Sequence, residues 1–196
     1  MSRRHQIREV AVQALYQLDL RGEQDAEQVR ATVDDAPVTG PMKQAAWELA
    51  LGAWGRRADA DRLSGELAPG WPAHRQPAVD RSILRLAYHE LADVGTPAAV
   101  AIDEAVELAK TFGSQRSPAF INGVLDKMAK RIERERPAAG EGGTGVPPVI
   151  GRHWMDDAAA EPSSNGAGDT AGGDRPAADP WLDDAIRNAR PTDSDK

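Results

Sequence analysis

Residues 99–127, AVAIDEAVELAKTFGSQRSPAFINGVLDK, set the architecture of this chain, because they predict two amphipathic helices joined by a short turn. Gly113 is the expected end of the first helix, and Ser117 and Pro118 supply an N-cap hydroxyl and an N1 proline for the second. Each helix must bury its apolar stripe against the other or against a third element. The stripes repeat at three- and four-residue spacing: Ile102, Ala105, Val106, Ala109 and Phe112, then Ile121, Val124, Leu125, Met128 and Ile132.

The opposite side of the first of these helices is charged, with Asp103, Glu104, Glu107 and Lys110. A charged helix face of this kind is usually solvated. The sequence offers these carboxylates no nucleophile or partner acid, and it contains neither a P-loop nor a dinucleotide-binding glycine motif. It therefore predicts a binding protein and no enzyme.

Apolar periodicity predicts four further helices upstream and no strand. They cover residues 2–20, 25–35, 42–67 and 77–94, and about six helices in all predict an all-α bundle. In the third helix Gly52 and Gly55 indicate either a close helix approach or a bend, since each glycine costs about 1 kcal/mol relative to alanine. The pattern of the fourth helix directs four polar residues outward: Asp80, Arg81, Arg85 and His89.

Composition divides the chain near residue 137. Residues 1–137 carry 19 Lys and Arg against 20 Asp and Glu, whereas residues 138–196 carry 5 against 11 and are rich in Gly, Pro, Ala, Asp and Ser. Such a segment cannot bury enough apolar surface to fold alone. We therefore expect one folded domain, 1–137, followed by a disordered acidic tail, 138–196.

Several classes of protein are not favoured. The four histidines lie in separate segments without metal-ligand spacing, and there is no cysteine, so no metal site and no cofactor is expected. No apolar run approaches the ~18 residues needed to span a membrane, and the N-terminus does not resemble a signal peptide. The expected location is the cytoplasm.

The start of the first helix is basic, with Arg3, Arg4, His5 and Arg8 in its first two turns. The helix macrodipole is already positive there, so each cation is disfavoured by ~0.3–1 kcal/mol. A polyanionic partner would explain the arrangement. A frayed, solvated basic end is the alternative that the cluster alone leaves open.

Four blocks of sequence carry a family resemblance: RE..VQALY at 8–16, DR.ILRLA..EL at 80–91, AIDEAVELAK.FG at 101–113 and FINGVLDK at 120–127. Together they resemble the NusB family of bacterial transcription antitermination factors, over roughly residues 3–132. The resemblance implies two three-helix sub-bundles that pair with the small-subunit ribosomal protein NusE. It also implies binding of boxA-type single-stranded RNA in nascent ribosomal RNA transcripts, within the RNA polymerase antitermination complex.

The resemblance also implies site residues. The basic start of the first helix, Arg3, Arg4, His5 and Arg8, would contact RNA phosphates, and the joint at 117–122 would lie near the RNA path. Phe120 could stack a base or belong to the core, and Asn122 could offer its amide. Arg116 replaces an acidic or variable family position and would strengthen phosphate attraction.

For the protein partner, the resemblance points to Tyr16, Asp80 and Arg85 as exposed contacts, although an internal ion pair of Asp80 or Arg85 is the alternative. A rival reading of the whole chain is a protein-binding scaffold or a homodimer without specific RNA recognition. The acidic tail could compete for the basic site or be a solvated appendage.

Overall fold

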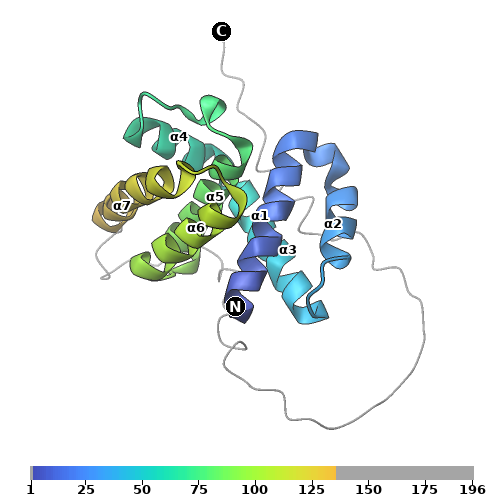
Figure 1. Ribbon diagram of the computed structural model, residues 1–196. Coiled ribbons are helices and arrows are strands. Elements are labelled where there is room, and N and C mark those ends of the chain that lie inside the picture. Colours follow the sequence, from blue (N-terminus) through green and yellow to red (C-terminus); the bar gives the residue numbers. More distant parts are fainter. Residues whose placement is uncertain (1, 136–196) are drawn as a thin grey trace, which may run out of the picture.

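The computed structural model describes residues 2–135, which form seven α-helices and no strand (Figure 1). The seven helices are α1 Arg3–Arg21, α2 Ala26–Asp34, α3 Gly40–Gly55, α4 Arg57–Leu67, α5 Ala78–His89, α6 Ala98–Phe112 and α7 Ser117–Glu135. Short 3-10 turns lie at Glu23–Asp25 (η1) and Ala73–Arg75 (η2), and a π-helical turn, Glu90–Val94 (η3), extends α5. The expected all-α class is confirmed.

The helices form two groups that share one core. Helices α1, α2 and α3 pack together, and α4, α6 and α7 surround α5, which also packs against α1 and α3 (Figure 1). Helices α1 and α3 pack closely, and four of their alanines are completely buried: Ala11, Ala46, Ala50 and Ala53. Small side chains allow this approach because they do not hold the two helix backbones apart.

The expected single helix over residues 42–67 is wrong, because the structure breaks it at Arg56. Arg56 leaves the helical conformation at φ −98° and ψ 7°, directly after Gly55. The Arg57 guanidinium then stacks 4.6 Å from the Trp54 ring centroid and binds Glu23 at 2.7 Å. These contacts hold the turn, and they split the predicted helix into α3 and α4.

Gly52 marks the close helix approach that its position suggested. A Cβ atom added there would lie 2.7 Å from Cε1 of His89 on α5. The His89 ring is buried and its Nδ1 lies 2.9 Å from Asp93 Oδ2, so it has little room to move. Helices α3 and α5 therefore meet closely only because residue 52 lacks a side chain.

Helix α5 is more central than its pattern indicated. Asp80, Arg85 and His89 were expected to point outward, but all three are buried, and only Arg81 is half-buried. The reason is that α5 is covered on several sides, by α1 and α3 as well as by α4, α6 and α7. The sequence predicted one apolar face for α5, but other helices surround most of its circumference.

The expected tail 138–196 and the domain boundary at 137 lie outside the described residues. Within residues 2–135, no helix combines the length and the apolar character that a membrane crossing requires.

Candidate functional site

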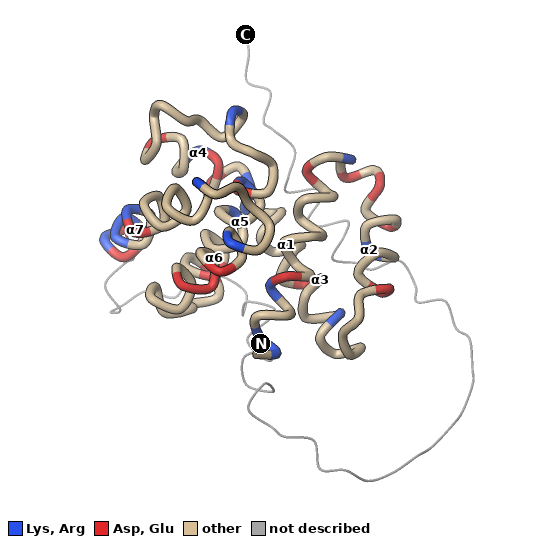
Figure 2. Tube along the Cα trace, in the orientation of Figure 1, with Lys and Arg blue, Asp and Glu red and all other residues tan. Residues whose placement is uncertain are grey.

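The first turn of α1 presents two exposed arginines, Arg3 and Arg4. The Ser2 hydroxyl caps the helix by accepting a hydrogen bond from the His5 amide at 3.1 Å, and no acidic residue lies in this turn. Figure 2 shows the basic residues at this end of the helix. The helix macrodipole and the two arginine side chains therefore make the capped start of α1 positive. An anion binds favourably at such a helix start.

Arg8 does not belong to this exposed group. Its side chain is 1% exposed, and its Nε and Nη2 atoms donate to the Glu90 carboxylate at 3.1 and 2.7 Å. Glu90 is equally buried, and it also accepts a hydrogen bond from the Thr96 hydroxyl at 3.2 Å. The structure thus contradicts the expected phosphate contact of Arg8, because RNA cannot reach a guanidinium enclosed by the protein.

His5 is also turned inward. Its Nδ1 lies 2.8 Å from Glu104 Oε2 on α6, and its Nε2 lies 3.5 Å from Glu9. Glu104 Oε2 lies 3.6 Å from Arg8 Nη1 as well. Glu104, expected on a solvated face, therefore connects the start of α1 to α6, and His5 serves this contact rather than an open RNA surface.

The joint between α6 and α7 exposes Arg116 and Asn122 as expected, whereas Phe120 is half-buried and packs against the core. The predicted N-cap role of Ser117 is wrong. Ser117 is the first residue of α7, it is buried, and its hydroxyl accepts from the Ser114 amide at 2.9 Å. The serine thereby stabilises the turn that carries Arg116.

Asp80 lies behind this joint and is not exposed as expected. Its side chain is hydrogen-bonded to Ser117, and its Oδ1 atom is buried without a hydrogen-bond partner among the described residues. Burial raises the pKa of Asp80, and the Ser117 hydrogen bond opposes this only in part. The start of α5 is therefore linked to the joint, but a partner protein could not touch this carboxylate without a local opening.

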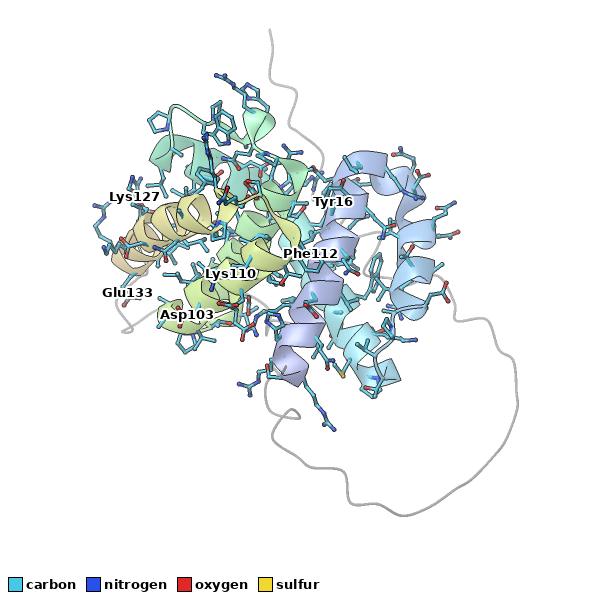
Figure 3. All side chains as sticks on the ribbon, in the orientation of Figure 1. Tyr16, Asp103, Lys110, Phe112, Lys127 and Glu133 are labelled. Atoms are coloured by element: carbon cyan, nitrogen blue, oxygen red, sulfur yellow. The ribbon has the colours of Figure 1, made fainter. Side chains whose placement is uncertain are left out.

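Of the expected partner contacts, Tyr16 remains at the surface, with 36% of its area exposed on α1 (Figure 3). Arg85 is buried, and its guanidinium joins Asp61 on α4 to Asp19 on α1. The internal ion pair that was the alternative for Arg85 is thus present.

A cleft of about 660 Å³ opens beside this ion-pair network, which the sequence did not indicate. Burial alone would raise the pKa of Asp19, but hydrogen bonds from Arg81 and Arg85 outweigh burial and lower it. The cleft lies where the end of α1, α4, η2 and α5 meet. It is lined by Asp19, Asp61, Arg62, Gly65, Pro72, Ala73, His74, Arg81 and Arg85.

Within residues 2–135 no three acidic or histidine side chains gather in a way that could hold a metal ion. The fold and the site together define an all-α protein of two packed helix groups, with exposed basic groups at a helix start and at a helix joint. The model of the NusB family matches residues 5–130, and this chain belongs to the NusB family.

Curated relatives agree with this assignment. The chain is 38% identical over 140 residues to the transcription antitermination protein NusB of Chloroflexus aggregans, covering 70% of this chain and 93% of the relative. It is 43% identical over 138 residues to the protein of the same name from Saccharopolyspora erythraea, covering 69% and 93%. Both relatives are named as transcription antitermination proteins.

Solved structures share the fold. NusB of T. maritima is 34% identical and has a TM-score of 0.59, with 65% of this chain and 90% of that chain covered. A crystal structure of the antitermination factors NusB and NusE in complex with dsRNA is 25% identical at a TM-score of 0.59, covering 66% and 97%. In that second structure a chain similar to this one is accompanied by both a protein and RNA.

Proposed function

We propose that this protein is an RNA-binding antitermination factor that pairs with NusE and recognises boxA-type single-stranded RNA in nascent ribosomal RNA transcripts. It would act in the cytoplasm, as part of the antitermination complex of RNA polymerase. The observation that carries the proposal is the exposed pair Arg3 and Arg4 on a capped helix start without an acidic residue. The structure of NusB, NusE and RNA named above supports the choice of partners.

The physical argument is electrostatic. Two cations at the positive end of the α1 macrodipole reduce helix stability by up to about 1 kcal/mol each. An RNA phosphate bound there offsets this cost, since its negative charge interacts favourably with the arginines and with the positive end of the helix dipole. Arg116 and Asn122 at the helix joint would add a third cation and an amide able to read a base edge.

Fluorescence anisotropy with a labelled boxA-type RNA tests the electrostatic part. Arg3→Glu/Arg4→Glu should weaken binding and lower the slope of log affinity against log salt by at least about 1 unit, because each contact with a single strand contributes about 0.7. The matched control is Lys127→Glu/Lys130→Glu, which makes the same charge change on two exposed residues of α7, of which Lys127 is labelled in Figure 3. Equal losses in both variants would show that only net charge matters.

Recognition of sequence is tested by comparing the boxA-type RNA with a scrambled strand, in the presence and absence of NusE. We expect discrimination to increase when NusE is present, and equal affinities with NusE bound would contradict the proposal. Light scattering of the protein alone decides the rival reading. A homodimer that binds no RNA would favour a protein-binding scaffold.

A further inference from the structure

We propose that Glu90 is a positioning residue for RNA binding, because it fixes, through Arg8, the direction in which the exposed first turn of α1 faces. This inference rests on the proposed function and adds to it a residue that does not touch RNA. Glu90 lies after the end of α5, in the π-helical turn η3. The cations that it positions are Arg3 and Arg4, one turn before Arg8 on α1.

The ion pair between Arg8 and Glu90 fixes an orientation. The two side chains are 1% and 2% exposed, and the guanidinium donates to the carboxylate through Nε at 3.1 Å and through Nη2 at 2.7 Å. The cost of burying two charges largely offsets their attraction, so a well-packed apolar pair is often equally stable. An apolar pair lacks direction, whereas two hydrogen bonds from one guanidinium fix its plane. The pair therefore supplies a geometry that apolar packing does not.

Glu90 is itself held in place by the chain that follows it. The Thr96 hydroxyl donates to Glu90 Oε1 at 3.2 Å, and the Thr96 amide donates to the Glu90 carbonyl at 2.9 Å. The Gly95 amide donates to the same carbonyl, and the left-handed conformation of Gly95, with φ 79°, returns the chain to Glu90. Single π-helical turns are rare and frequently lie at functional sites. The carboxylate is therefore a fixed acceptor for Arg8.

Arg8 transmits this fixed position to the first turn of α1. Arg4 lies four residues before Arg8, one helical turn away on the same face, so a rotation of α1 that moved Arg8 would move Arg4 equally. Another charged contact of this end of α1, between His5 and Glu104 on α6, is nearer to solvent, since the Glu104 side chain is 24% exposed. The enclosed pair is therefore the firmer of these two contacts.

The test replaces the ion pair by apolar residues in Arg8→Met/Glu90→Leu, which leaves the net charge unchanged. Anisotropy with the labelled boxA-type RNA should show a loss of affinity of about 5- to 50-fold, because the long side chains of the first turn must then be ordered on binding. The matched control is Glu23→Leu/Arg57→Met. It removes a 2.7 Å ion pair beyond the other end of α1 and should leave the affinity unchanged.

A pair with only a structural role would act independently of the exposed arginines. The exchange is therefore repeated in a protein that carries Arg3→Gln/Arg4→Gln. There the further loss should shrink below about 2-fold, since the first turn no longer carries cations to position. An equal loss in both backgrounds, or no loss in the otherwise wild-type protein, would overturn the inference and leave the proposed function intact.

Thr96→Val tests the same role without exchanging the ion pair, because it removes the hydroxyl that holds Glu90 and keeps the shape of the side chain. RNA affinity should fall by about 2- to 10-fold, the range for one hydrogen bond, and Thr96→Ser should bind like wild type. Full affinity of folded Thr96→Val would contradict the role of Glu90 even if the double variant failed to fold. Wild-type protein that bound no RNA would overturn the proposed function and this inference together.

Discussion

The contact between α1 and α5 uses opposite charge arrangements at its two ends. At the start of α1 the cation is on α1, where Arg8 binds Glu90, and at the end of α1 the anion is on α1, where Asp19 binds Arg81 and Arg85. Arg8 and Asp19 are 11 residues apart, about three helical turns, so they share one face of α1. Because Arg8 pairs with the end of α5 and Asp19 with its beginning, the two helices run antiparallel.

The two ends differ in their access to water. Arg8 and Glu90 are 1% and 2% exposed, with Thr96 completing the carboxylate's contacts, so this end is closed. The Asp19 cluster borders a cleft, and Asp61 beside it is 27% exposed. The same chemistry therefore serves as an internal connection at one end and as the floor of a surface at the other. Burial, rather than residue type, separates a structural arginine from one that a ligand can approach.

Removing one partner of the buried ion pair at the closed end should reduce the free energy of unfolding more than any change at the open end. Arg8→Ala should reduce the free energy of unfolding by about 3–5 kcal/mol, because it leaves the Glu90 charge buried and unpaired. Urea unfolding followed by circular dichroism at pH 7 measures it. The double variant Arg8→Met/Glu90→Leu should lose much less, since no charge remains buried. A loss below about 1 kcal/mol in Arg8→Ala would mean that water reaches this end after all.

Removing a partner at the open end should reduce the free energy of unfolding less than at the closed end, and this loss should depend on pH. Asp19→Asn should cost about 1–3 kcal/mol at pH 7, because one carboxylate serves two arginines. The native pKa of Asp19 lies below its ordinary value of 3.8, so its stabilisation is present above that pH and is lost as pH falls through the native pKa. Unfolding curves of both proteins should therefore converge in acid. Asp126→Asn, which removes an exposed α7 ion pair, is the control and should change little.

The contribution of Asp80 to stability should change with pH in the direction opposite to that of Asp19. Burial raises its native pKa, so the native state holds the proton more tightly than the unfolded chain and loses stability as pH rises. Asp80→Asn should raise the urea midpoint at neutral pH, and this gain should shrink as the pH falls toward 4. A lower midpoint for Asp80→Asn at pH 7 would indicate that the charged carboxylate has a favourable partner.

The smallest expected effect concerns RNA. Glu104→Gln removes one negative charge beside the start of α1, so RNA affinity should rise by about 2- to 5-fold at low salt and return to normal at high salt. Glu107→Gln, an exposed position on the same helix paired with Lys110, should do less. A fall in affinity would instead show that the contact of Glu104 with His5 is needed to position the first turn of α1.

Much of the fold followed from periodicity, since the spacing of apolar residues along one helix is a local property. The apolar stripes of α6 and α7 were visible in that way, and Gly52 indicated the close approach of another helix. Near Gly55 the sequence indicated at most a bend. The complete break at Arg56 was not visible, because the apolar stripe continues across it and the turn is held by contacts of Arg57 with Glu23, 34 residues away in sequence.

The site was harder to predict than the fold. Arg3, Arg4 and Arg8 look alike in the sequence, but of the four basic residues predicted at the start of α1 only Arg3 and Arg4 lie at the surface, as Arg116 and Asn122 do at the helix joint. Arg8, Asp80 and Arg85 were placed at the surface and are buried, since each lies on a helix face that a second or third helix covers. Whether the exposed residues contact RNA or NusE stays a prediction.

The amino-acid order specifies which residues share a helix face, where most helices begin and end, and that the first turn of α1 is positive, because all three depend on neighbours within a few positions. Which arginine is enclosed and which is open depends on the pairing of α1 with α5, between residues that are more than 60 positions apart. Charge burial is set by that packing. The same residue type therefore forms an internal ion pair at Arg8 and an exposed cation at Arg3, and only the assembled bundle distinguishes them.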